Sequence, residues 1–178
     1  MIIIPGWLIA AITFPGVIVH ETAHLLFCKW RKVPVLDVCF FQFKNPAGYV
    51  IHEAPADFTS AFLISVGPLI VNSLLCVLIC FPSSFPLQIY DILNPAGMLF
   101  LWLGISIGMH AFPSTQDAKL LWQAARREAG NMNPLAILSF PLVVLIFIAN
   151  ILSVVWFDSL YGIFLGFFLP QWAISKWM

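Results

Sequence analysis

Long apolar runs, each about the length of a membrane span, are the feature that most limits how this chain can fold. A helix needs about 20 apolar residues to cross a bilayer. The runs predict five helices, over about 3–28, 57–81, 93–112, 134–157 and 159–176. The chain is 61% hydrophobic and 9% charged, whereas soluble domains carry about 25% charged residues. The sequence therefore predicts one all-α membrane domain over residues 1–178, with a core at about 10–125 and extra helices at about 134–176.

The segments between these runs predict smaller elements. Only Asp158 separates the last two runs, so they are joined by a tight turn or form one broken or re-entrant element. Residues 33–51 are rich in β-branched and aromatic types around an Asn-Pro-Ala-Gly turn, which predicts a small β-hairpin or sheet. Residues 114–130 predict an amphipathic helix that Gly130 ends. We expect its basic residues to face water and its apolar side chains to face the bilayer: Leu120, Leu121 and Trp122.

The positions of the basic residues predict how the chain is oriented. In a five-helix arrangement all eight Lys and Arg residues fall on one side, and the connection over 82–92 has none. The eight are Lys29, Arg31, Lys32, Lys44, Lys119, Arg126, Arg127 and Lys176. The positive-inside rule makes that side cytoplasmic, with the N-terminus outside and the C-terminus in the cytoplasm. A formal net charge of zero gives no indication of a nucleic-acid partner.

An H-E-x-x-H motif lies inside the first apolar run, at His20, Glu21 and His24. On a helix the two histidines share one face, so they can bind one Zn²⁺ ion while Glu21 acts as a general base. Ionisable residues at membrane depth are costly and indicate a functional site. His20 precedes Lys29 by nine residues, or about 13 Å of helix. The motif predicts a catalytic zinc centre near the cytoplasmic face.

Catalytic zinc usually has three protein ligands and an open position for water. We predict Asp117 as the third ligand, because it follows the third apolar run on the side where the first run ends. The alternative is that Asp117 only completes a capping box with Ser114. His110 lies at a similar depth, and we predict that it acts in catalysis beside the metal. A structural histidine and a direct ligand are its two alternatives.

The chain resembles the site-2 protease family of intramembrane zinc metalloproteases, in a minimal form without accessory domains. The resemblance covers roughly residues 10–125 and depends on three motifs. The first is His20–His24, the second is the Gly-Pro-Leu-Ile-Val-Asn element ending at Asn72, and the third is the Pro-x-x-x-Asp spacing ending at Asp117. The third departs from the family pattern, because Phe112 stands in place of Asn and Ala118 in place of Gly.

The resemblance implies a substrate that binds as an extended strand beside a small sheet and is cut next to the zinc. It implies that Asn72 contacts the substrate backbone, with a helix–helix hydrogen bond as the alternative. Asn45 and Gly48 are predicted to contact substrate from the hairpin turn, with a simple turn as the alternative. The expected substrate is a membrane protein, with a single-span helix in the bilayer, cut near the cytoplasmic face.

Other functions compete with this prediction. One is a membrane zinc protease whose third ligand is a glutamate, for which Glu53 and Glu128 are the spare candidates. Another is a catalytically inactive scaffold or a metal-binding transport component, although the intact Glu21 disfavours a scaffold. Oligomeric state, the physiological substrate and the role of the last two helices do not follow from the sequence.

Overall fold

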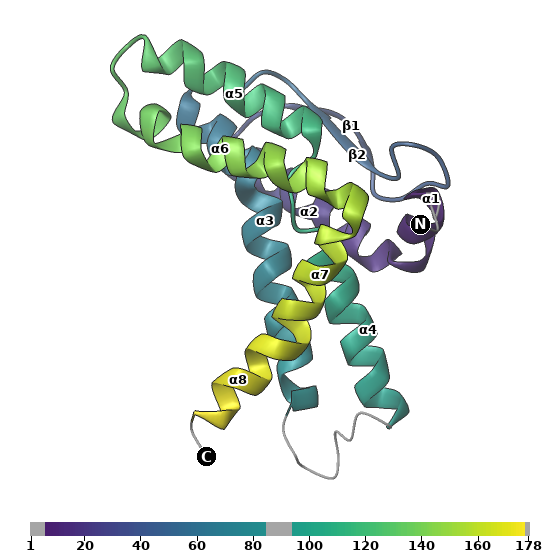
Figure 1. Ribbon diagram of the computed structural model, residues 1–178. Helices are drawn as coiled ribbons and strands as arrows, with labels where there is room; N and C mark the ends of the chain where they lie inside the picture. The colour runs from purple at the N-terminus through teal and green to yellow at the C-terminus, as the bar shows by residue number, and fades with distance from the viewer. Residues whose placement is uncertain (1–5, 85–93, 177–178) are drawn as a thin grey trace.

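The computed structural model describes residues 6–84 and 94–176, which are mostly helical with one small sheet (Figure 1). This confirms the predicted balance of helix and strand. The elements are α1 (Gly6–Ile12), α2 (Phe14–Trp30), β1 (Val35–Cys39), β2 (Tyr49–His52), α3 (Phe58–Cys80), the 3-10 turn η1 (Phe81–Ser84), α4 (Pro95–Met109), α5 (Thr115–Ala129), α6 (Pro134–Leu152), the 3-10 turn η3 (Ser153–Val155), α7 (Phe157–Ile163), the π-helical η4 (Phe164–Phe168) and α8 (Leu169–Ser175).

Three helical columns form the lower bundle in Figure 1: α3, α4 and the continuous run α7–η4–α8. The interface consists of small residues, because Cys76 and Cys80 on α3 lie directly against glycines of α4. Both cysteine side chains are fully buried, as expected for small residues between helices. Close packing of small residues is the usual way in which helices associate in a membrane. The bundle thereby holds the end of α4 next to α2 and α3.

The helices α5 and α6 lie together across the end of the bundle where α3 begins (Figure 1). Leu121 of α5 is fully buried in a cluster with residues of α3 and α6, and Trp122 packs edge-on against Phe140. The prediction that Leu121 and Trp122 face the bilayer is therefore wrong, because α6 covers them, whereas Leu120 is exposed. Lys119, Arg126 and Arg127 are exposed as predicted.

The first apolar run is broken at Thr13 instead of forming one helix. The helices α1 and α2 meet at 88°. Pro15 stands in the first turn of α2, where its missing N–H is tolerated, whereas inside a helix it would remove a hydrogen bond. The Thr13 hydroxyl donates to the Ile9 carbonyl at 2.7 Å and ends α1. A continuous helix over 3–28 is therefore wrong here, and residues 3–5 lie outside the described part of the chain.

Five membrane spans are not what the structure shows. Within the described ranges two helices are long and apolar enough to cross a bilayer, Phe58–Cys80 and Pro134–Val155, or three if α1 and α2 count as one bent span. The helix α4 is apolar but shorter. The predicted spans over 57–81 and 134–157 thus match α3 and α6 in length and composition, and α6 lies beside α5 and not parallel to the bundle (Figure 1).

The predicted position of Lys176 is also wrong. It ends α8, which packs against η1, so it lies at the end of the bundle from which the connection over 82–92 departs. Arg31, in contrast, bonds Ser60 and Asp57 at the start of α3, at the opposite end. Lys176 and Arg31 lie at opposite ends because α6 crosses the end of the bundle where α3 begins. The run α7–η4–α8 then returns along the bundle toward its other end. The basic residues therefore do not all share one side.

The predicted hairpin is present. β1 and β2 pair antiparallel, with Val38 opposite Val50, and an irregularity between Val35 and Asp37 bends the first strand. The intervening loop contains a cis peptide bond at Asn45–Pro46. Both strands pack against α2, so the hairpin lies beside the helix that carries the H-E-x-x-H motif.

Gly16 is where α2 approaches α4 most closely, and we expect Gly16→Ala to destabilise the protein. A Cβ at this position would collide with the Ser106 carbonyl oxygen and the His110 ring. Since a main-chain atom cannot rotate away, the helices must separate, at a cost of about 1–3 kcal/mol. Thermal unfolding in detergent measures the effect. Gly6→Ala is the matched control, because nothing lies within 4 Å of a Cβ there; equal melting temperatures for the two variants would contradict the packing argument.

Candidate metal centre

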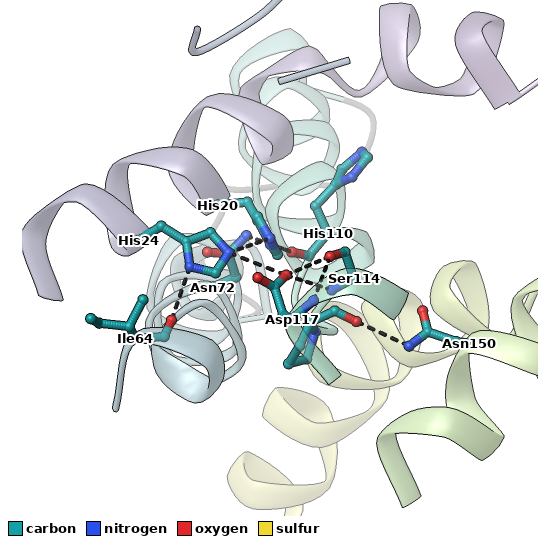
Figure 2. A network of polar contacts seen from close by, with 9 residues as sticks. His20, His24, Ile64, Asn72, His110, Ser114, Asp117 and Asn150 are labelled. Carbon is teal, nitrogen blue, oxygen red and sulfur yellow. Dashed lines mark hydrogen bonds and ion pairs between the residues drawn. The ribbon is translucent and has the colours of Figure 1, made fainter. Parts of the chain in front are cut away.

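His20 and His24 lie one turn apart on α2, and their Nε2 atoms face each other at 3.1 Å (Figure 2). Each Nδ1 lies within hydrogen-bond distance of a main-chain carbonyl: His20 of His110 O at 2.7 Å, and His24 of Ile64 O at 2.9 Å. A carbonyl can only accept, so both Nδ1 atoms donate. Both Nε2 atoms then have a lone pair available, which is the form in which imidazole binds a metal ion.

Asp117 approaches the two imidazoles from the first turn of α5. Its Oδ2 lies 3.5 Å from Nε2 of His24. Three possible ligand atoms lie within 4.8 Å of one another, one each from His20, His24 and Asp117. Asp117 also completes a capping box, since its Oδ2 accepts from the main-chain N–H of Ser114 at 2.9 Å and from the Ser114 hydroxyl at 2.6 Å. The capping box is therefore present, and the same carboxylate lies close to the two histidines, so capping and a ligand role are compatible.

The separations of these atoms fit a small divalent ion. Ligand atoms bound at about 2.0–2.2 Å around a tetrahedral zinc ion lie about 3.3–3.5 Å apart. The two nitrogens, at 3.1 Å, and the nitrogen–oxygen pair, at 3.5 Å, are close to this spacing. Two imidazoles and a carboxylate are also a common ligand set for zinc. The three ligand atoms all lie within 4.8 Å of one another, so the group is a candidate site for such an ion.

The surroundings of Asp117 favour its ionised form. Burial opposes ionisation of this carboxyl, but its contacts with His24 and Ser114 outweigh burial and hold its pKa well below the usual value. A metal ligand must be deprotonated. Asp117 is therefore a carboxylate at neutral pH, as a ligand requires.

Glu21 lies beside the three candidate ligands and is buried, at 8% exposure. Among the residues of the described ranges, none forms a hydrogen bond or ion pair with its carboxylate. Gly48 of the hairpin packs directly on it, because a Cβ at that position would come within 2.8 Å of the Glu21 Cγ. A larger residue at position 48 would push the hairpin away from the site.

Two cavities border the candidate centre, and both are lined by His20 and Glu21. The first cavity, of about 390 Å³, adds His24, Asp117 and residues of β2 from Tyr49 to His52. The second cavity, of about 260 Å³, adds the loop from Asn45 to Gly48 and residues of α6 and α7. Asn45 and Gly48 thus lie beside the candidate centre, as the sequence predicted for substrate contacts, although the substrate role itself stays a prediction.

His110 reaches the site through its main chain more than through its ring. Its carbonyl accepts from His20, as described above, and its Nε2 lies 2.8 Å from the Thr13 hydroxyl oxygen. Since that hydroxyl donates to Ile9, the His110 Nε2 donates to Thr13. Figure 2 shows the ring pointing away from the facing Nε2 atoms. His110 also lines the second cavity, and its predicted role in catalysis stays a prediction.

Asn72 is fully buried between three helices. Its Nδ2 lies 3.0 Å from His110 O, 3.1 Å from Ile107 O and 3.4 Å from Gly16 O. The geometry thus matches the helix–helix hydrogen bond that was the alternative to a substrate contact. By holding the His110 carbonyl, Asn72 also helps to position His20.

Several residues at the site carry no sequence signal that identifies them. Ile64 contributes a main-chain carbonyl, which any residue type could supply. Asn150 and Asp158 line the second cavity but belong to the C-terminal helices, where they stand singly among apolar residues. The available indication was an isolated polar residue in an apolar run, which for Asp158 predicted only a turn.

Comparison of the chain with protein-family models, with curated proteins and with solved structures gives no match. The site is therefore interpreted from its own geometry.

We expect Asp117→Ala to lower the affinity for zinc by more than about 100-fold, since it removes one of three ligands. His110→Ala should retain zinc, because the carbonyl that holds His20 belongs to the main chain. The metal content of both purified variants after equilibration with buffered zinc measures this difference. Zinc retained in Asp117→Ala and lost in His110→Ala would reverse the assignment of the third ligand.

Proposed function

We propose that this protein is a zinc-dependent protease that hydrolyses peptide bonds of membrane proteins. The observation that best supports this proposal is that His20, His24 and Asp117 lie together beside Glu21. In the described part of the chain the Glu21 carboxylate has no hydrogen bond or ion pair. A purely structural zinc site would use a fourth protein ligand, whereas a catalytic site has three and an open position. Within the described residues the cluster has three members, and it borders two cavities.

The residues around the centre suit acid–base chemistry on an amide. When bound, zinc would supply Lewis acidity and make a water molecule more acidic. Glu21, which lines both cavities, accepts the proton of the attacking water and passes it to the leaving amine. The carbonyls of His110 and Ile64 fix the tautomers of His20 and His24, so that each Nε2 stays available.

The hairpin offers a place for an extended substrate. β2 has β1 on one side, and Tyr49–His52 line the first cavity. Within the described ranges the sheet has two strands, so the other edge of β2 has no strand partner. A peptide that adds to this edge gains main-chain hydrogen bonds and is held extended beside Glu21. A transmembrane helix must be unwound in this way before its peptide bond can be attacked.

The distribution of charge suggests where the site lies relative to the bilayer. Four basic residues lie at the end of the bundle where α3 begins: Lys119, Arg126 and Arg127 on α5, and Arg31 beside Ser60. The positive-inside rule places this end at the cytoplasmic face. The candidate centre lies between α5 and α2 near that end (Figures 1 and 2). We therefore propose a membrane-embedded or membrane-proximal substrate that is cut near the cytoplasmic face.

Glu21→Gln tests the proposal directly. We expect cleavage of apolar single-span peptides in detergent micelles to fall by about 100-fold or more, because the general base is lost. Zinc content should be unchanged, since Glu21 is not one of the three candidate ligands. Mass spectrometry of the products measures cleavage.

The matched control is Glu53→Gln, which removes an exposed carboxylate from the hairpin outside both cavities. It should cleave as the wild type does. A wild-type protein that is loaded with zinc and cuts no peptide, or a Glu21→Gln variant as active as the wild type, would refute the protease function.

A further inference from the structure

The second cavity contains a carboxylate that the proposed mechanism does not use. Asp158, in the first turn of α7, lines this cavity of about 260 Å³ together with His20 and Glu21. Its side chain is partly buried. Glu21 and Asp158 therefore line the same cavity from two different helices, α2 and α7.

Asp158 lacks the partners that a structural carboxylate usually has. Over residues 6–84 and 94–176, no hydrogen bond or ion pair involves its side chain, and no Lys or Arg lines the cavity. Asp57 and Asp117, in contrast, both accept hydrogen bonds at the start of a helix. A partly buried carboxylate without a cation is less stable than a paired one, and a bound cation would supply the missing partner.

The other polar groups of the cavity also include acceptors. The Nδ2 of Asn150 donates to Pro113 O at 3.1 Å and to Ile146 O at 3.0 Å (Figure 2). These bonds fix the orientation of the amide, and its Oδ1 remains available as an acceptor. Asn45 enters the cavity from the hairpin loop. Amide oxygens beside a carboxylate suit a donor-rich cation such as an ammonium or a guanidinium group.

The cavity also lies where part of an extended substrate would pass. Asn45–Gly48 line the second cavity and Gly48–His52 line the first, so the chain leading into and along β2 passes from one cavity to the other. His20 and Glu21 line both. A peptide on the free edge of β2 would therefore cross the candidate centre with one flank near the first cavity and the other near the second.

We propose that the second cavity is a specificity subsite in which Asp158 binds a Lys or Arg side chain of the substrate, a few residues to one side of the scissile bond. This inference rests on the proposed protease function and names its substrate class. The substrate is a membrane segment whose apolar sequence is interrupted by one basic residue near the cleavage point. Asp158 is thus a specificity-determining residue, separate from the metal ligands and the general base.

A panel of synthetic apolar peptides tests the subsite, each with a single Lys, Arg, Gln or Glu moved along the sequence. In micelles, zinc-loaded wild type should cleave the Lys and Arg peptides with a kcat/KM about tenfold above that of the Gln peptide, at one or two adjacent positions. Asp158→Asn should reduce this ratio to near one and leave zinc content unchanged, because Asp158 is not one of the three candidate ligands. Asp158→Lys should favour the Glu peptide, and Glu53→Gln should behave as the wild type.

Two results would overturn the subsite: a wild type without preference for a basic residue, or a preference that persists in Asp158→Asn. If the wild type cleaves no peptide, the protease function fails, and binding of the same peptides decides about the subsite. Fluorescence anisotropy with Glu21→Gln protein should then show tighter binding of Lys peptides than of Gln peptides. Equal binding of the Lys and Gln peptides would exclude Asp158 as the recognising group. So would a difference in binding that persists in the double variant Glu21→Gln, Asp158→Asn.

Discussion

The main-chain carbonyl of His110 is the acceptor on which the arrangement of the site depends. It lies at the end of α4, where the last carbonyls have no partner within their own helix. His20 on α2 donates to it at 2.7 Å and Asn72 on α3 at 3.0 Å. Three helices therefore meet at one oxygen atom, and this fixes both the ring orientation and the tautomer of His20.

Packing explains why this acceptor can be reached from two sides. Gly16 allows α2 to lie against the Ser106 carbonyl, and the small side chains of Cys76 and Cys80 allow α3 to lie against α4. Buried polar groups are tolerated in such an interior when they bond one another. Asn72 follows this rule only with its Nδ2, because its Oδ1 is buried without a hydrogen-bond partner in the described structure. Its three carbonyl neighbours require its nitrogen on their side, which leaves the oxygen on the other side without a partner.

Local sequence patterns predicted much of the candidate site. The spacing of His20 and His24 places both on one face of any helix, and Ser114 with Asp117 has the spacing of a capping box wherever a helix begins. The hairpin followed from its turn residues and β-branched strands. Each of these features depends on neighbours within a few residues, so each is determined largely by the chain itself.

Features that depend on distant packing were not predictable in this way. The packing of α6 along α5 depends on Leu121 and Phe140 meeting side chains far away in sequence, and hydropathy does not encode such contacts. The position of Lys176 follows from that packing. The bend at Thr13 had a local indication in Pro15, which the length of the apolar run concealed. The His110 ring was expected at the metal, whereas its backbone does the positioning.

The capping box at the start of α5 has a consequence for how such a centre is assembled. Asp117 is held by Ser114 through three hydrogen bonds that need no ion. The Nδ1 atoms of both histidines are likewise held by carbonyls of the fold. The candidate ligand atoms are therefore in place once the chain has folded, so an ion bound there would be taken up late, lost and replaced while the polypeptide around it keeps its shape.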